Sequence, residues 1–388
     1  MNNKPHAIII GGGFTGCAVA HDLALRGFAV TLLERGELTS GTSGRTHGLL
    51  HSGARYCVND SEAAIECIEE NIILRKIAAQ CVVFNQGLYV ALNDEDMAYA
   101  PLFEKGAAQS KIETIKLTPK QALDLEPALN PKVLLAYKVP DGTFDPLRLA
   151  FAFAASAHLN GAELRPYHEV EGFLKDGQGN VTGVKVWDRT SNKRYELNGD
   201  ITINATGAWA GQVSKMLGIN TAVIPTPGVM VAYDQRVTQR VINRLNMPGD
   251  GDIIIPQRRM AVIGTTSFEV ENPDYIPITE DQVQLMHKCA EELVPALKNI
   301  KVRGIYMSAR PLIKSATAGR SLSRTFKCYD HKANEGMDGI VSIIGGKATT
   351  SRVMAEKTSD LVCQKLGIKT ECRTHDLPLA SYRDVYRV

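Results

Sequence analysis

The sequence predicts an α/β fold, α+β in overall character, with a mostly parallel sheet and a second, antiparallel sheet. Three observations lead to this prediction. The chain has 388 residues, which is long for one compact core and favours two tightly coupled domains. A strand, a helix and a second strand follow one another within the first 34 residues. From Glu163 onward the pattern turns to short strands, as expected for another sheet.

The N-terminal unit is built around two short apolar runs. Residues Ala7 to Ile10 and Val30 to Leu33 are continuous and rich in β-branched residues, which is typical of strands buried on both faces. Between them, Cys17 to Leu25 is predicted to be a helix that ends at Arg26-Gly27, a basic residue followed by a glycine. The turn before this helix has a G-x-G-x-x-G pattern, and an acidic residue follows the second strand: Gly11, Gly13, Gly16 and Glu34.

Each residue of this pattern has a physical role in binding a dinucleotide. Gly11 allows the tight turn, Gly13 lets the backbone approach a pyrophosphate, and Gly16 lets helix and strand pack closely. The phosphates then lie at the helix N-terminus, where N–H groups and the helix dipole favour an anion. Glu34 can accept hydrogen bonds from ribose hydroxyls and disfavours the 2′-phosphate of NADP. The pattern therefore predicts a Rossmann-like dinucleotide site, without separating FAD from NAD.

Further elements follow in order along the chain. Between Ser61 and Ala157 we expect a long amphipathic helix (61–79), a strand (87–92), a helix (near 119–125) and a helix with Asp145 as its N-cap. Beyond Glu163 we expect a meander (169–174 and 181–187), a buried strand (200–205), strands of the antiparallel sheet (224–233 and 253–264), a helix (281–297), a last strand (339–344) and a helix through Leu366.

The order of these elements favours FAD over NAD. An NAD dehydrogenase usually continues with β-α repeats directly after the first unit. Here a polar segment from Gly36 to Tyr56 intervenes, and strands that fit the same sheet return only at 201–205 and 340–344. A cofactor domain made of three separated pieces suits the long, extended FAD.

Composition limits the function classes. The net charge of +2 argues against a nucleic-acid partner, which requires a concentrated basic patch. The eight cysteines include no Cys-x-x-Cys pair, so we expect no metal site, and free thiols in a reducing cytoplasm. No apolar run approaches the ~20 residues of a membrane-spanning helix. We therefore expect a cytoplasmic protein, with peripheral attachment at the inner face of the cell membrane left open.

One continuous stretch carries a resemblance to a known family. The string from Gly41 to Tyr56, GTSGRTHGLLHSGARY, resembles the FAD segment of flavin-dependent glycerol-3-phosphate dehydrogenases, in particular that of the catalytic A subunit of the anaerobic enzyme. Four further blocks occur in the same order as in that family, at 204–209, 263–266, 308–312 and 345–350. The resemblance covers residues 7 to 380. It implies the fold of D-amino-acid and glycine oxidases, with FAD as the cofactor.

The resemblance implies a discontinuous FAD-binding domain over residues 1–80, 145–215 and 335–370. It places a substrate-binding cap over 81–144 and 216–334, followed by a tail over 371–388. The residues that would bind or position FAD are Gly11, Gly13, Phe14, Thr15, Gly16, Glu34, Arg35, Thr42, Ser43, Arg45, Thr46, His47, Gly48, Leu49, Val170, Thr206, Gly207, Trp209, Gly346, Lys347, Ala348, Thr349 and Thr350.

The resemblance also implies how a substrate binds. Arg55, Tyr56, Arg310 and Lys347 would grip its phosphate, since guanidinium groups bind phosphate bidentately and lysine adds a point charge. The alternative is that Arg310 pairs with a carboxylate and Lys347 holds the flavin's pyrimidine edge or phosphate. His51 is expected to take the hydroxyl proton, because a neutral imidazole suits proton abstraction near pH 7. The alternative is that His51 only orients the flavin.

The implied function is oxidation of a small anionic hydroxy compound, foremost sn-glycerol 3-phosphate to dihydroxyacetone phosphate, with hydride transfer to flavin N5. Two other interpretations keep the flavin: a hydroxyphosphonate, 2-hydroxy acid or amino acid as substrate, or a non-catalytic electron relay.

Three departures from the family pattern bear on this function. Ser351 stands where the family usually has an aromatic residue, which predicts a larger site and a different substrate, and Met307-Ser308-Ala309-Arg310 replaces the more usual Ser-Gly-Val-Arg. The sequence stops at Val388 without the family's cysteine-bearing C-terminal domain. The electron acceptor is therefore left open among dioxygen, a quinone and a partner subunit.

Overall fold

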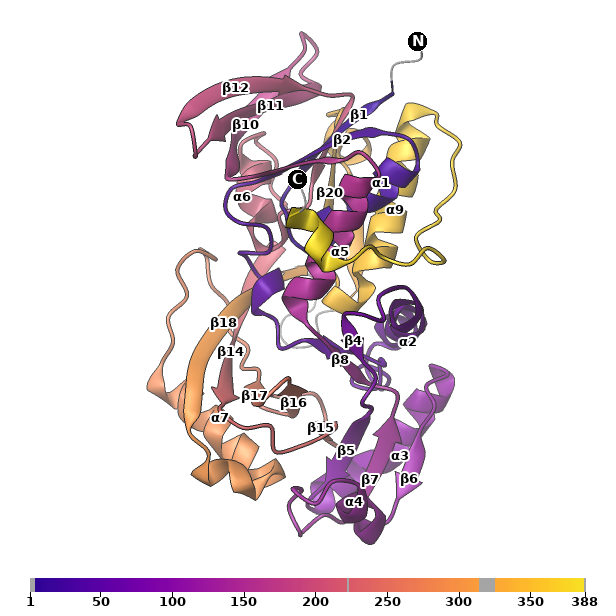
Figure 1. Cartoon of the computed structure of the whole chain (residues 1–388), viewed down its shortest axis with the longest axis vertical. Coiled ribbons are helices and arrows are strands. Elements are labelled where there is room, and N and C mark those ends of the chain that lie inside the picture. Colours follow the sequence, from indigo (N-terminus) through magenta and orange to yellow (C-terminus); the bar gives the residue numbers. More distant parts are fainter. Residues whose placement is uncertain (1–3, 222, 314–324, 387–388) are drawn as a thin grey trace.

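The computed structural model describes residues 4–221, 223–313 and 325–386, which form two large sheets arranged one above the other along the long axis (Figure 1). The upper sheet has six strands in the order β19-β20-β13-β1-β2-β9. All its neighbouring pairs are parallel except β19 with β20. Its strands are β1 (His6–Ile10), β2 (Ala29–Glu34), β9 (Glu163–Pro166), β13 (Ile201–Asn204), β19 (Phe326–Asp330) and β20 (Ile340–Gly345). The prediction that strands near 201–205 and 340–344 join the sheet of the first unit is confirmed.

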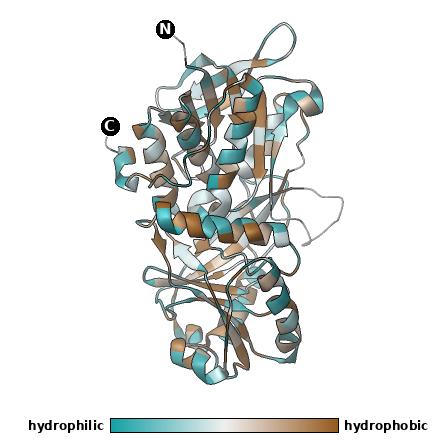
Figure 2. Cartoon of the chain, turned by 90° about the vertical axis from the view of Figure 1, so that its right-hand side faces the viewer, coloured by the Kyte–Doolittle hydropathy of each residue, from teal (hydrophilic) through white to brown (hydrophobic). Residues whose placement is uncertain are grey.

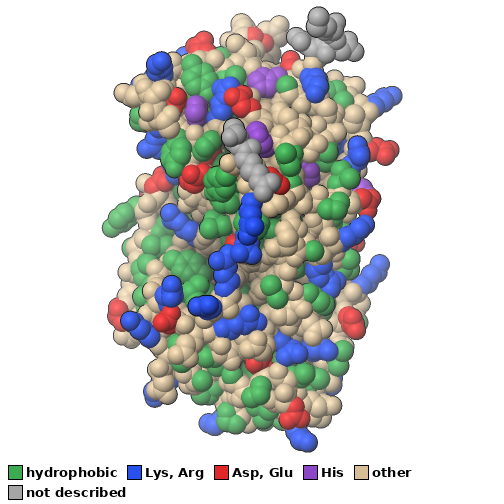
Figure 3. Space-filling view, viewed as in Figure 1, with side chains coloured by type: hydrophobic (Ala, Val, Ile, Leu, Met, Phe, Trp, Pro, Cys, Tyr) green, Lys and Arg blue, Asp and Glu red, His purple; other side chains and the backbone are tan. Residues whose placement is uncertain are grey.

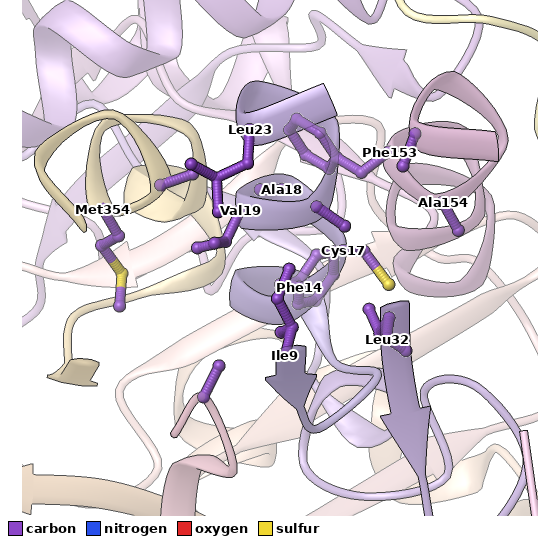
Figure 4. Close-up of a cluster of buried hydrophobic side chains, with 14 of the residues drawn as sticks. Ile9, Phe14, Cys17, Ala18, Val19, Leu23, Leu32, Phe153, Ala154 and Met354 are labelled. Atoms are coloured by element: carbon purple, nitrogen blue, oxygen red, sulfur yellow. The ribbon is translucent and has the colours of Figure 1, made fainter. Parts of the chain in front are cut away.

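The two faces of β1 explain the layers around the upper sheet. Ile9 points toward a core under α1 (Phe14–Leu25), α5 (Pro146–Leu159) and α9 (Ser351–Leu366), where it lies next to Phe14 (Figure 4). Ile8 and Ile10 belong to a separate cluster with residues of a three-stranded meander. This meander consists of β10 (His168–Lys175), β11 (Val181–Asp188) and β12 (Lys193–Asn198). A strand that is apolar throughout is therefore buried on both faces, as its sequence predicts.

The lower sheet has eight strands in the order β18-β14-β17-β16-β15-β5-β7-β6. Its neighbouring pairs are antiparallel except β15 with β5. Its strands are β5 (Gly87–Ala91), β6 (Ile115–Leu117), β7 (Leu135–Val139), β14 (Val223–Tyr233), β15 (Val241–Arg244), β16 (Ile253–Gln257), β17 (Met260–Gly264) and β18 (Val302–Ile313). Both predicted pieces of the cap thus contribute strands to one sheet. β19, from the range 216–334, joins the upper sheet, and the domain boundaries themselves stay a prediction.

The remaining elements join or cover the two sheets. A small sheet of β3 (Leu49–Leu50), β8 (Gly142–Phe144) and β4 (Val82–Val83) lies at the junction. Figure 2 looks onto α2 (Ser61–Ile77), which crosses the middle of the molecule. The other helices are α3 (Asp94–Gln109), α4 (Pro119–Leu125), α6 (Ala210–Lys215), α7 (Glu280–Leu293) and α8 (His331–Glu335). In the described part of the chain, every helix is too short or too polar to span a bilayer.

Several sequence predictions of elements need correction. α1 begins three residues earlier than predicted, at Phe14, directly after the glycine turn. The helix predicted over 281–297 ends at Leu293, because Pro295 opens a separate 3₁₀ turn. The run 253–264 is two strands joined by a turn at Arg258-Arg259. The helix α3 and the long strand β18 were not predicted. By contrast, Asp145 is confirmed as the N-cap of α5, where its side chain accepts the N–H of Arg148.

Candidate active site

The turn between β1 and α1 is too tight for side chains at its glycines. Gly11 has a φ of +107°, a conformation that favours glycine. A Cβ on Gly16 would lie 1.9 Å from the carbonyl oxygen of Gly11. α1 has no side-chain cap at Gly13 and no acidic residue in its first turn. The helix N-terminus therefore keeps its affinity for an anion and fits the pyrophosphate of a dinucleotide.

Glu34, at the end of β2, braces the same turn. Its Oε2 accepts the N–H of Gly12 at 2.8 Å, and its Oε1 accepts the N–H of Gly36 at 2.9 Å. These bonds fix the carboxylate at the wall of a large cavity. The contact with a ribose stays a prediction.

That cavity has a volume of about 990 Å³ and is lined by residues of both large sheets and of the 39–56 segment. Its size is at the upper end for ligand sites and suits a cofactor together with a small substrate. It brings together most of the residues singled out from the sequence: Gly11, Gly13, Phe14, Thr15, Glu34, Arg35, Thr42, Ser43, Arg45, Thr46, His47, Leu49, His51, Arg55, Tyr56, Val170, Thr206, Gly207, Trp209, Arg310, Gly346, Lys347 and Ala348.

Four of the predicted residues lie behind the cavity lining. Gly16 packs against the turn, and Gly48 lies against the backbone carbonyl of Phe144 and the side chain of Gln257. The Oγ1 of Thr349 accepts the N–H of His51 at 3.1 Å, and that of Thr350 accepts the N–H of Lys347 at 3.0 Å. The two threonines therefore hold the backbone of two residues that do line the cavity.

Arg35, Trp209 and Asp274 form one part of the cavity wall. The guanidinium of Arg35 lies 4.9 Å from the centroid of the Trp209 ring, and both side chains donate to Oδ1 of Asp274, at 2.5 Å and 2.9 Å. This places Trp209 beside the residue that follows Glu34.

The side-chain rings of His47, His51 and Tyr56, which also line the cavity, lie close to one another. The ring centroids of His47 and His51 are 6.3 Å apart, and those of His51 and Tyr56 are 5.3 Å apart. The Nζ of Lys347 lies 4.8 Å from the centroid of the Tyr56 ring. The proposed base and part of the proposed anion clamp thus form one cluster, although they come from two segments almost 300 residues apart in the sequence.

Two arginines that also line the cavity, Arg55 and Arg310, are held by different partners. The Nη2 of Arg55 donates to the carbonyl of Gly249 at 2.9 Å and to Asp252 at 3.2 Å. The guanidinium of Arg310, from β18, donates to oxygens of the lower sheet and the segment after it: the carbonyls of Thr226, Pro227 and Thr266 and the hydroxyl of Thr265. The carbonyls and the hydroxyl fix the position of the Arg310 charge at the cavity wall.

The positive charges of Arg55 and Arg310 help to lower the pKa of the His47 imidazole. Burial, together with the nearby charges of Arg55 and Arg310, lowers the pKa of His47 to about 3. His47 is therefore a neutral imidazole at physiological pH.

Lys347 precedes the 3₁₀ turn η4 (Ala348–Thr350), which packs against α2. Two α2 residues respond to its charge. Burial raises the pKa of Glu66 to about 7, and Lys347 partly opposes that rise. Burial likewise raises the pKa of Cys67 to about 11, so this thiol stays protonated.

The two substitutions relative to the family pattern have different places. Ser351 is fully buried, lies outside the cavity lining and donates its hydroxyl to the carbonyl of Ala348 at 2.8 Å, so an effect of this position on the size of the site stays a prediction. Ser308 does line the cavity, next to Arg310.

Sequence reasoning missed part of the lining. Asn59 and Asp60 directly precede α2, and Met247, Gly249 and Asp250 come from a turn of the lower sheet. The second group carried a turn signal, Pro248-Gly249, but nothing in the sequence relates this turn to Arg55. Only the fold brings the two together.

The family of the chain follows from a family model described as FAD dependent oxidoreductase, which matches residues 6–352. This range contains the glycine turn, the 41–56 segment and the Gly-Gly-Lys turn. The chain belongs to this family. It is therefore an FAD-dependent oxidoreductase, and FAD is its cofactor.

Two members of the family with known names are similar to this chain over almost its whole length. The A1 subunit of the anaerobic glycerol-3-phosphate dehydrogenase of Haloferax volcanii is 42% identical over 397 residues, which cover 99% of this chain and 68% of that protein. The A-type subunit of the corresponding Escherichia coli K12 enzyme is 39% identical, covering 96% of this chain and 69% of that protein.

Solved structures show the same fold at lower identity. L-proline dehydrogenase from P. horikoshii superposes with a TM-score of 0.77 at 22% identity, covering 99% of this chain and 98% of that one. The FAD complex of glycerol-3-phosphate dehydrogenase from Bacillus halodurans has a TM-score of 0.74 at 24% identity, covering 97% of this chain and 68% of that one.

Proposed function

We propose that this protein oxidises sn-glycerol 3-phosphate to dihydroxyacetone phosphate. The observation that carries the proposal is the convergence of Arg55, Arg310 and Lys347 on one cavity that also holds His51. Cations that line one cavity attract an anionic ligand, although Arg55 also has the carboxylate of Asp252 at 3.2 Å. The names of the relatives at 42% and 39% identity support the choice of substrate.

The roles of the residues follow from their chemistry. Arg55, Arg310 and Lys347 bind the phosphate, with Tyr56 beneath the ammonium group of Lys347. His51 takes the proton of the hydroxyl group that is oxidised. FAD, when bound, would accept the hydride from the carbon that carries this hydroxyl group. Lys and Arg side chains gather over the middle of the face seen in Figure 3.

Anaerobic reduction of the bound flavin tests this function. We expect glycerol 3-phosphate to bleach the flavin absorbance of the purified protein without oxygen. Bleaching only by a 2-hydroxy acid, a hydroxyphosphonate or an amino acid would show that the protein is an oxidoreductase with that compound as its substrate instead of glycerol 3-phosphate. Reduction by dithionite but by none of these compounds would favour an electron relay.

We further propose that the electrons pass to a partner subunit, since the similar curated proteins are themselves named as subunits. The bleached protein is mixed with air-saturated buffer and, separately, with a soluble quinone. We expect slow reoxidation by oxygen. Fast reoxidation with one hydrogen peroxide formed per flavin would make dioxygen the acceptor, and fast reoxidation by the quinone alone would make a quinone the acceptor.

A further inference from the structure

His47 lies in the cavity wall with one ring nitrogen already engaged. Its Nδ1 accepts the backbone N–H of Leu49 at 3.2 Å. A ring nitrogen that accepts a hydrogen bond carries no proton, so the neutral ring carries its proton on Nε2. The local fold therefore selects the tautomer.

The backbone around His47 is fixed as well. The side chain of Gln257, at the end of β16, donates to the carbonyl oxygens of His47 and Phe144, both at 2.9 Å. The lower sheet thereby clamps the segment between η1 (Ser43–Arg45) and β3. The backbone carbonyl of His47 and the Nδ1 of its ring are thus both held by other parts of the protein.

The protonation state of His47 is fixed by its surroundings. With a pKa lowered to about 3 by burial, Arg55 and Arg310, the ring does not gain a second proton at physiological pH. A positive imidazolium would add a further charge to a site that already holds two arginines. A neutral N–H donor adds a hydrogen bond without that repulsion.

The Nε2 atom of His47 carries the N–H group of the ring. Among the residues that the structure describes, Nε2 has no hydrogen-bond partner. The ring nevertheless lines the cavity, 6.3 Å from the ring of His51 and within the electrostatic reach of both arginines. This N–H is therefore accessible to a molecule that binds in the cavity.

We propose that the Nε2–H of His47 donates a hydrogen bond to an oxygen of the bound anion, next to the proposed clamp of Arg55 and Arg310. His47 then binds the substrate, in place of the FAD-positioning role that the resemblance implies for it, and proton abstraction is left to His51. The inference rests on the proposed function only in that the substrate is an anion.

The test uses the full chain loaded with FAD and two variants. His47→Gln keeps an N–H donor at about the distance of Nε2 from the backbone, whereas His47→Leu has none. Inorganic phosphate is the probe, and its binding is followed as a perturbation of the flavin spectrum. We expect His47→Leu to raise the Kd for phosphate by about tenfold or more, as for a lost hydrogen bond to a charged group. His47→Gln should stay within about threefold of the parent, and both variants should keep their FAD.

Three results would overturn the inference. The first is a His47→Leu variant that binds phosphate as well as the parent. The second is an equal loss of FAD and of phosphate affinity, which would assign His47 to the cofactor. The third is a parent protein without phosphate affinity. The probe needs no turnover, so failure of glycerol 3-phosphate to bleach the flavin is recorded independently of these results.

The pH profile of kcat/KM gives a further readout, measured with whichever substrate bleaches the flavin. The acidic limb of the profile should be the same in the parent and in His47→Gln, because His47 does not titrate in this range. Loss of that limb in His47→Gln would identify His47 as the base and would refute the proposal.

Discussion

Behind the Gly-Gly-Lys turn, a buried ion pair joins α9 to α2. The Nε of Arg352 donates to both carboxylate oxygens of Glu70, at 3.1 Å and 2.9 Å, and the two side chains are 4% and 3% exposed. The Nη1 of the same guanidinium donates to Glu356 at 2.7 Å and to Thr374 at 3.2 Å. One arginine thus ties two helices and the C-terminal segment together. We predict that Arg352→Met lowers the stability of the whole molecule.

The size of the effect follows from burial. Removing one partner of a buried ion pair leaves an uncompensated charge, here Glu70, and costs about 3–5 kcal/mol. An unfolding entropy of about 2.1 cal/mol/K per residue amounts to roughly 0.8 kcal/mol/K for a chain of this length. The expected decrease in Tm is therefore about 4–6 °C.

Thermal unfolding followed by circular dichroism, on protein loaded with FAD, measures this change. Glu70→Leu, Arg352→Met and the double variant complete a cycle. We expect the double variant to be more stable than the sum of the two single changes implies, because two apolar side chains leave no buried charge. A decrease in Tm below about 1 °C for Arg352→Met, or additive effects of the two substitutions, would refute the reasoning.

Three further predictions concern the cofactor, the substrate and the pH. Gly16→Ala should abolish FAD binding, because its Cβ would lie 1.9 Å from the carbonyl oxygen of Gly11, and a stoichiometric flavin absorbance after purification would contradict this. Arg310→Ala should raise the KM for the substrate more than about tenfold while FAD content stays constant, and an equal loss of flavin would show that Arg310 serves the cofactor. Burial raises the pKa of Glu66 to about 7, so the folded protein binds this proton more tightly than the unfolded chain does. The resulting contribution to the free energy of unfolding is fully present below pH 4.5 and is lost as the pH rises through 7. Glu66→Gln should therefore raise Tm by about 1–3 °C at pH 8.5 and leave it unchanged near pH 4.5, and a difference independent of pH would disprove the assignment.

The elements that the sequence predicted well are governed by short-range signals. The bounds of α4 match the prediction, and its Thr118 and Gln121 form a capping box. α3 escaped notice because Pro101 lies inside it and interrupts the helical pattern, although Asn93 caps its start. β18 was not predicted because it lacks a continuous apolar run, and most of its residues are exposed or only partly buried. It forms by pairing with β14 along almost its whole length. A strand that depends on its neighbour is not visible in its own sequence.

The candidate site shows the same division. The residue types of the cluster, His47, His51, Arg55, Arg310 and Lys347, were evident from the sequence. Their partners were not: the Asp252 carboxylate that accompanies Arg55 and the backbone carbonyls that hold Arg310 come from the lower sheet. Contacts between segments far apart in the chain follow from packing and not from local pattern.

The sequence by itself determined the dinucleotide turn and the three-piece sheet, because glycine conformations, helix caps and runs of apolar residues act over a few residues of chain. Only the tertiary structure decided the protonation state and the tautomer of His47. His47 and His51 lie four residues apart, on either side of β3, and have the same side chain. Burial, the charges of two distant arginines and the N–H of Leu49 keep His47 neutral and fix its proton on Nε2. Desolvation and electrostatic interaction depend on distances in space, which the order of residues does not specify.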